Sequence, residues 1–246
     1  MRAAGRPLVA LALAAAVLAA PGPRAAGQGS SGIVGVTSIG SGAEETWVFL
    51  PGEDPPTCLV VFLHGAGDPT PSRYLGWLDH LALDAACAVI FPRYQVARNT
   101  APTTLGGLRA GVSAGVGHVR RARFGFEGRR VPKKLRTVVV GVGLGGDLAF
   151  YYAANAKRWG LPVPAAIDSI FPTSASIRGV PLEPVPHGTR VLVQTRGGDR
   201  DVRAYLAPHP ASRKRFQTVR SPANAPLQTT PFAINTFWAP VDELIG

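Results

Sequence analysis

The stretch that decides the fold is LRTVVVGVGLGG, at residues 135–146. Its first part, residues 137–140, is entirely β-branched, which is typical of a central strand buried on both faces. Its second part, residues 141–146, has glycine at four of six positions, and glycine is the residue of tight turns. Residues 146–159 then follow with a helical pattern. The stretch therefore predicts a buried strand, a tight turn and a helix in succession.

The rest of the chain repeats this alternation of short β-rich runs and helix-length segments, which is typical of a mostly parallel sheet. Eight strands are expected, at residues 33–38, 46–50, 58–63, 88–91, 135–140, 165–171, 190–195 and 215–219. Helices are expected at residues 74–86, 104–124, 146–159, 201–206 and 232–244. Residues 28–246 fit one α/β domain, because no internal repeat indicates a second.

In this context, residues 141–145 resemble the G-x-S-x-G nucleophile elbow of the α/β-hydrolase superfamily of lipases and esterases. Gly143 occupies the position of the nucleophile serine. Gly141 and Gly145 fit the motif, because the turn packs the helix tightly against the strand and leaves no room for side chains. The elbow residue itself takes a strained conformation of positive φ, which glycine adopts without steric cost. Gly143 thus keeps the fold and removes the chemistry.

A second motif, His64-Gly65-Ala66-Gly67, ends the expected strand at 58–63. It resembles the turn with which the same family directs backbone N–H groups at the reacting carbonyl, where small residues allow close approach. The resemblance covers nearly the whole of residues 28–246. It implies about eight mostly parallel strands flanked by helices. The fold is expected to be minimal and lidless, since residues 171–190 hold four prolines and little helical pattern.

The family's acid follows a later strand, and Asp201 matches that position best, with Asp199 as the alternative. Both residues could instead simply cap the following helix. The family's histidine follows the last strand, but the chain has no histidine beyond His209. Asn224 stands where the histidine would be expected, and an amide cannot accept a proton near neutral pH. The triad is therefore predicted to be degenerate.

Three functions remain open. The first is a pseudoenzyme that binds an unknown small molecule, an ester-like ligand or a protein through a remnant pocket. The pocket residues are then His64, Gly65, Ala66, Gly143 and Leu144, with Asp201, and Tyr94 and residues near Phe171 are expected to line an open groove. The second is a secreted ester hydrolase whose nucleophile is displaced to Ser174 or Ser176. The third is a basic protein that binds a wall or another anionic polymer.

Neither a metal nor an organic cofactor is expected. Metal sites need two or three converging ligands, and no HxH, HExxH or CxxC spacing occurs. The glycines at 141–146 do not fit a dinucleotide or phosphate loop, because they follow the fifth strand and lack both a P-loop lysine and a ribose-binding acid.

The amino terminus indicates export. Residues 1–27 form a predicted signal peptide, with Arg2 and Arg6 ahead of an apolar run at residues 8–20 and small residues before an expected cleavage ahead of Gln28. An uncleaved anchor is the alternative, and no later stretch is apolar enough to span a membrane. The mature protein is thus expected to be secreted or extracytoplasmic.

Two further features bear on an exported protein. Cys58 and Cys87 each precede an apolar run. If those runs are neighbouring parallel strands, the two residues are expected to form a disulfide. The alternative is that both are buried thiols. The chain carries a net charge of +11, with basic clusters at residues 120–136 and 213–220. Such clusters suit an anionic wall polymer, a lipid headgroup or a nucleic acid, although they are also common on a solvated face.

Overall fold

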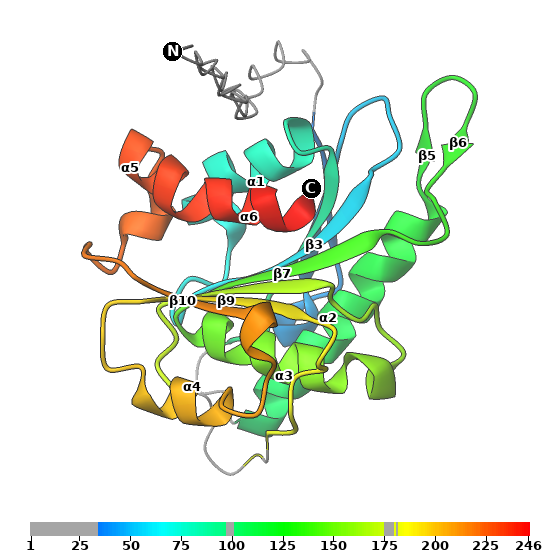
Figure 1. Cartoon of the computed structure of the whole chain (residues 1–246). Coiled ribbons are helices and arrows are strands. Elements are labelled where there is room, and N and C mark those ends of the chain that lie inside the picture. The colour runs from blue at the N-terminus through cyan, green and yellow to red at the C-terminus, as the bar shows by residue number, and fades with distance from the viewer. Residues whose placement is uncertain (1–33, 97–100, 175–179, 181) are drawn as a thin grey trace, which may run out of the picture.

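Eight strands form one sheet, and helices cover both of its faces (Figure 1). The computed structural model describes residues 34–96, 101–174, 180 and 182–246, so the predicted signal peptide lies outside the described residues. The strands of the sheet are β1 (Gly35–Ile39), β2 (Thr46–Leu50), β3 (Cys58–Leu63), β4 (Cys87–Pro92), β7 (Arg136–Val142), β8 (Ala166–Ile170), β9 (Arg190–Thr195) and β10 (Lys214–Thr218).

The strand order is β1-β2-β4-β3-β7-β8-β9-β10. β2 pairs antiparallel with both of its neighbours, and every other pairing within this sheet is parallel. The carboxyl ends of β3, β7, β8, β9 and β10 therefore meet at one edge of the sheet, which we call the elbow edge. Their amino ends meet at the opposite edge.

The two faces of the sheet carry separate hydrophobic cores. One face is covered by α2 (Ala101–Arg121), α3 (Leu144–Trp159) and α4 (Arg200–Tyr205) (Figure 1). The other face is covered by α1 (Leu75–Leu83), α5 (Pro231–Ala233), a π-helical turn (Ile234–Trp238) and α6 (Ala239–Ile245). Short 3-10 turns lie at Gly42–Glu44, Pro71–Tyr74, Ala211–Arg213 and Ala225–Leu227. Among the described helices, none is both long and apolar enough to cross a bilayer.

The predicted mostly parallel sheet of eight strands is confirmed, and each strand boundary agrees within two residues. The sequence missed a hairpin, β5 (Arg123–Phe124) and β6 (Arg129–Arg130), because the helical pattern was extended to residue 124. Gly125 and Gly128 turn the hairpin, with φ of 63° and 61°. The helix predicted at residues 232–244 is interrupted by the π-helical turn. The described residues of the β8–β9 connection carry no helix or strand.

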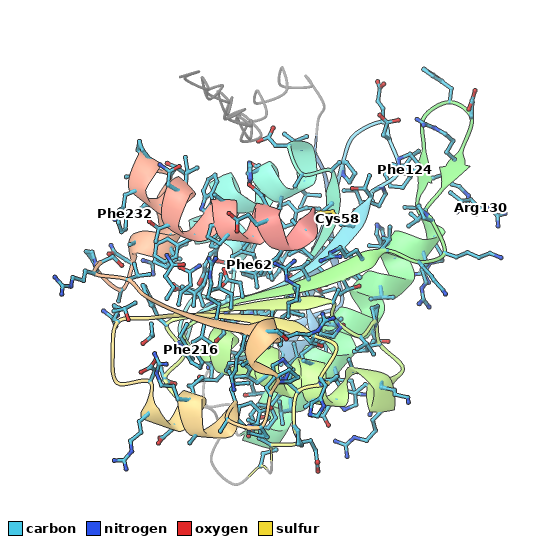
Figure 2. All side chains as sticks on the ribbon, viewed as in Figure 1. Cys58, Phe62, Phe124, Arg130, Phe216 and Phe232 are labelled. Carbon is cyan, nitrogen blue, oxygen red and sulfur yellow. A yellow bond between two sulfur atoms is a disulfide. The ribbon has the colours of Figure 1, made fainter. Side chains whose placement is uncertain are left out.

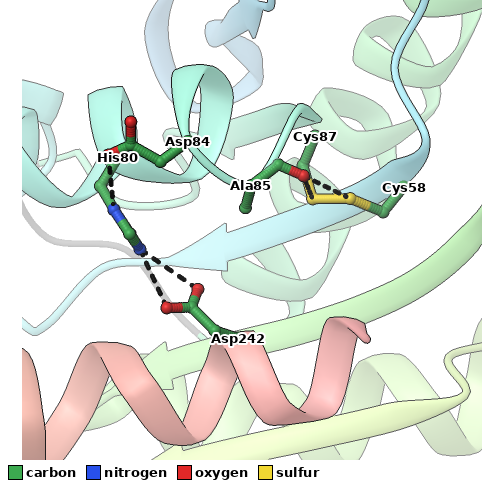
Figure 3. Close-up of polar contacts among 6 residues, drawn as sticks. All are labelled: Cys58, His80, Asp84, Ala85, Cys87 and Asp242. Carbon is green, nitrogen blue, oxygen red and sulfur yellow. Dashed lines mark hydrogen bonds and ion pairs between the residues drawn. A yellow bond between two sulfur atoms is a disulfide. The ribbon is translucent and has the colours of Figure 1, made fainter. Parts of the chain in front are cut away.

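Cys58 and Cys87 form a disulfide, which is one of the two states that the sequence predicted for them. The two residues are directly opposite each other at the starts of β3 and β4, with Cα atoms 4.6 Å apart (Figure 3). The bridge closes a loop with a sequence separation of 29 residues. It therefore ties together the amino ends of two central strands.

We expect the double variant Cys58→Ser/Cys87→Ser to fold with a free energy of unfolding about 3 kcal/mol lower, because the unfolded chain regains the entropy of this loop. Urea unfolding of both proteins measures the difference. Reduced wild type is the control, and it should lose the same amount. Equal unfolding midpoints for oxidised wild type and the variant would show that the bridge does not stabilise the fold.

His80 joins α1 to α6 through two carboxylates (Figure 3). Its Nε2 atom lies 3.1 Å from Asp242 Oδ2, and its Nδ1 atom lies 2.9 Å from Asp84 Oδ2. The hydrogen bond to Asp242, aided by the contact with Asp84, raises the pKa of His80 despite partial burial. The imidazolium can donate from both nitrogens, so the charged form suits this position. This histidine thus has a structural explanation.

Candidate functional site

The turn at Gly143 has the backbone geometry that the sequence predicted for an elbow. Gly143 has φ 57° and ψ −118°, and it immediately precedes α3. Its N–H group donates to the carbonyl oxygen of Ile170, 2.8 Å away, at the end of β8. A Cβ atom built on Gly143 would have one heavy atom within 4 Å, the Cα atom of Gly65 at 3.9 Å. The position therefore has space for a side chain but a backbone that favours glycine.

The neighbouring glycines are required by close packing. A Cβ atom on Gly141 would lie 2.1 Å from the carbonyl oxygen of Gly145, and one on Gly145 would lie 2.1 Å from that of Leu63. These distances are far below van der Waals contact, and the obstructing atoms are backbone. The first turn of α3 therefore lies directly on the end of β3, which brings Gly143 beside the His64–Gly67 turn.

His64 is completely buried at the end of β3. Its ring stacks on Tyr94 with centroids 4.0 Å apart, and the Tyr94 hydroxyl donates to the His64 carbonyl oxygen. Burial lowers the pKa of His64 to about 4, so the imidazole is neutral near pH 7. Its Nε2 atom is buried without a hydrogen-bond partner among the described residues. His64 thus supports the turn from behind.

Two N–H groups of the turn are already engaged within the protein. The Gly65 N–H donates to the Tyr74 hydroxyl at 2.8 Å, and the Gly67 N–H donates to Gln95 Oε1 at 3.3 Å. Ala66, between them, is exposed. A ligand that accepts hydrogen bonds from Gly65 or Gly67 would have to displace these partners.

The two candidate acids follow β9 and differ in their surroundings. Asp201 is exposed in the first turn of α4. Asp199 is half-buried, and its Oδ2 atom lies 2.8 Å from Arg203 Nε, so it forms an ion pair within its own helix end. Asp201 is therefore the acid that is open to solvent, whereas Asp199 is held by a neighbour.

The position expected for the base holds an exposed amide. Asn224 precedes the 3-10 turn Ala225–Leu227 after β10, and its side chain makes no capping hydrogen bond there. All five histidines of the chain are described, and His64 is the one in the turns around Gly143. His187 and His209 contact each other, and His209 Nε2 lies 2.9 Å from the Thr189 carbonyl oxygen, just before β9 begins. They belong to the opposite edge of the sheet.

Sequence reasoning missed Asp147, a buried carboxylate in the first turn of α3. Its oxygens accept the N–H groups of Thr173 and Ser174, both at 3.0 Å, and the Thr173 hydroxyl. Burial raises the pKa of Asp147 to about 6. An acid in a first helical turn is ordinary, so its position alone gave no signal. Asp147 fixes the loop after β8, next to the elbow.

The groove residues and displaced nucleophiles expected from the sequence are only partly placed. Leu144 is half-buried, and Phe171 is nearly buried with the Arg196 guanidinium 5.1 Å from its ring centroid. Tyr94 is fully buried beneath His64, so the prediction that it lines an open groove is wrong. Its hydroxyl satisfies a backbone carbonyl instead. Ser174 lies in the loop held by Asp147, and Ser176 lies outside the described residues.

No pre-existing metal centre is evident in the described part of the chain: no group of three or more His, Cys, Asp or Glu side chains is placed to hold an ion. What meets at the elbow edge is a glycine elbow, a small-residue turn, a buried neutral imidazole and exposed polar side chains. Gly143, which has no side chain, supplies no nucleophile to this edge.

Comparisons with known proteins place this geometry in a known fold. No family model and no curated protein matches the sequence. Carboxyl esterase 2 from the fungus Tuber melanosporum is a structural match at 17% identity and TM-score 0.61, covering 88% of each chain. Bacterial heroin esterase matches at 13% identity and TM-score 0.63, covering 87% of this chain and 85% of that one. Dienelactone hydrolase from Anabaena variabilis matches at 17% identity and TM-score 0.55, covering 87% and 97%.

At such identities the similarity concerns the fold alone. The chain therefore has the α/β-hydrolase fold that the elbow and the His-Gly turn predicted.

Proposed function

From an α/β-hydrolase fold whose elbow carries glycine, we propose that this chain is an exported pseudo-hydrolase. It binds a small molecule, an ester-like ligand or a partner protein at the remnant pocket. We assign Gly65, Ala66, Gly143 and Leu144 to this pocket, with His64 supporting it from behind and Asp201 as the remaining acid of the degenerate triad.

The observation that carries the proposal is Gly143 in the elbow conformation with open space before it. Acyl transfer needs an oxygen or sulfur nucleophile activated by a base. Gly143 supplies no nucleophile, and Asn224 cannot take a proton. His64 cannot replace the base, because it is buried and its pKa is lowered to about 4. The open space is what a bound ligand could occupy.

The proposal of export is supported by the sequence of residues 1–27 and by the disulfide. Disulfides persist mainly in oxidising compartments outside the cytoplasm. Amino-terminal sequencing of the secreted protein tests this point. A mature chain that begins at Gln28 is the expected result.

We expect wild type to be unlabelled by a serine-reactive fluorophosphonate and inactive on a small activated ester. Gly143→Ser should remain folded but nearly inert, and it should be destabilised by about 1–3 kcal/mol because a Cβ atom is forced into the elbow backbone. Gly143→Ser/Asn224→His should gain weak turnover if Asp201 orients the new imidazole. Labelling, ester turnover and thermal unfolding of the three proteins test these outcomes together.

Two hydrogen bonds at and beside Ser174, one of the two expected displaced nucleophiles, favour a second function, that of an ester hydrolase. The Thr173 hydroxyl and the Ser174 N–H group both bond to Asp147, a carboxylate whose pKa is raised to about 6. The control for the labelling experiment is therefore Thr173→Val/Ser174→Ala, which removes both hydroxyls. Labelling of wild type that disappears in this variant would overturn the pseudo-hydrolase and establish the displaced-nucleophile hydrolase.

A further inference from the structure

The amino ends of the parallel strands form a basic surface opposite the elbow. β7, β9 and β10 begin at Arg136, Arg190 and Lys214. The segment 120–136, which leads into β7, holds eight basic residues and a single acid, Glu127. We call this surface the basic edge. It accounts for a large part of the net charge of +11.

A hollow of about 870 Å³ opens on the basic edge between α2, α3 and the segment before β7. Its apolar lining includes Val119 and Leu161, and its cations are Arg120, Arg130, Lys133 and Lys134. All four cations are exposed, and none makes an ion pair within the described residues. The hollow thus combines an apolar lining with unpaired positive charge.

The β5–β6 hairpin projects from the body of the protein (Figure 1), and Arg130 of β6 lines this hollow. Phe126 lies between its two strands and is fully exposed, at 112% of the reference area. Figure 2 shows Arg130 pointing away from the body at the base of the hairpin. Three acids reduce the local positive charge: Glu127 neighbours Phe126, Glu53 lines a small hollow with Phe126, and Asp54 pairs with Arg129 at 2.6 Å. The hairpin nevertheless presents a bare aromatic ring ahead of several cations.

We propose that the basic edge is a docking surface for a bilayer that contains anionic phospholipid. The Phe126 ring enters the headgroup layer, where aromatic side chains are favoured. The cations around the hollow then contact lipid phosphates, and each cation near such a surface strengthens binding about fivefold. Cations alone would also suit a nucleic acid or a wall polymer. The projecting ring and the apolar hollow favour a bilayer, because they gain only from a partner that is itself partly apolar.

The test is sedimentation with vesicles of phosphatidylcholine, with and without phosphatidylglycerol. All proteins have the same amino terminus, so any contribution of residues 1–27 cancels. Wild type should bind the anionic vesicles, less strongly as salt rises, and should leave the neutral vesicles unbound. Arg130→Gln/Lys133→Gln/Lys134→Gln should weaken this binding about a hundredfold. Phe126→Ala should weaken it measurably at unchanged charge.

The matched control is Arg109→Gln/Arg200→Gln/Arg220→Gln, which removes the same charge from exposed arginines outside segment 120–136 and the hollow. It should bind like wild type. Equal losses in the two triple variants would overturn the proposal, because general attraction would then explain the binding. The proposal also fails if anionic vesicles are not bound. Binding of double-stranded DNA in preference to vesicles, insensitive to Phe126→Ala, would identify a polyanion surface instead. Thermal unfolding verifies that each variant is folded.

Discussion

Asp168→Asn is expected to stabilise the protein at high pH by several kcal/mol. Asp168 is completely buried in β8. Burial raises its pKa from 3.8 to about 8, although a hydrogen bond from Gln194 and the charge of Arg215 oppose the shift. The Gln194 Nε2 atom lies 3.0 Å from one carboxyl oxygen, and the other oxygen has no partner among the described residues. The folded protein therefore holds a carboxylic acid that is mostly protonated at neutral pH.

The direction in which stability changes with pH follows from the number of protons that the folded and unfolded chains bind. Between about pH 4 and pH 8 the folded protein binds more protons at this site than the unfolded chain, so the free energy of unfolding falls as pH rises. A shift of about four pKa units corresponds to roughly 5 kcal/mol. The asparagine side chain stays neutral at every pH, and its carbonyl oxygen can still accept the hydrogen bond from Gln194. Its buried amide hydrogens lack a partner, which lowers the free energy of unfolding by about 1–3 kcal/mol. The net gain for Asp168→Asn is therefore about 3 kcal/mol near pH 9.

Urea unfolding of wild type and Asp168→Asn at about pH 4 and pH 9 measures this effect. Wild type should be the more stable protein at the lower pH, and the variant at the higher. The control is Glu127→Gln, which removes a carboxylate from the exposed hairpin. Of wild type and Glu127→Gln, the same protein should be the more stable at both pH values. A stability difference that does not change with pH would contradict a raised pKa for Asp168.

Gly145→Ala is expected to abolish or severely reduce the yield of folded protein. The added methyl would lie 2.1 Å from the Leu63 carbonyl oxygen and 2.6 Å from that of His64. Both atoms belong to the backbone of β3 and the turn after it, which is fixed by parallel partners on either side. Relief would require α3 to move off the sheet, so the expected loss exceeds about 4 kcal/mol.

The matched control is Gly106→Ala, in α2, where an added Cβ meets no heavy atom within 4 Å. That change should stabilise the protein by roughly 0.5–1 kcal/mol, because alanine is the better helix former. Gly143→Ala should fall between the two, since its space is open and only its backbone is strained. Soluble yield and thermal unfolding give the ranking. If Gly145→Ala melted like Gly106→Ala, the close approach of α3 to β3 would be refuted.

The close approach of α3 to β3 also explains why the sequence predicted this part of the fold correctly. Valines at 138–140 and glycines at 141 and 145 leave few alternatives to a buried strand followed by a helix packed against it, and the structure agrees. The β5–β6 hairpin was missed because two-residue strands have too little periodicity to be distinguished from the end of a helix. Its two turn glycines were the available signal.

The candidate site was harder to predict, because side-chain burial depends on packing from distant segments. The sequence located the His64 turn but not the covering Tyr94 ring, which comes from the end of β4 and makes the imidazole inaccessible. Asp147 was missed for a related reason: its partners Thr173 and Ser174 follow another strand. Its role becomes visible only when β7 and β8 are placed side by side.

The parallel sheet also separates two sites electrically. β7 has seven residues and runs from the basic edge to the elbow edge, a span of about 20 Å. The Debye length at physiological ionic strength is about 8 Å. Along the solvated surface between the two edges, salt would therefore reduce the field of an anionic surface on the basic edge to roughly a tenth at Gly143. A charged ligand at the elbow would bind with nearly the same affinity whether or not the opposite edge is occupied.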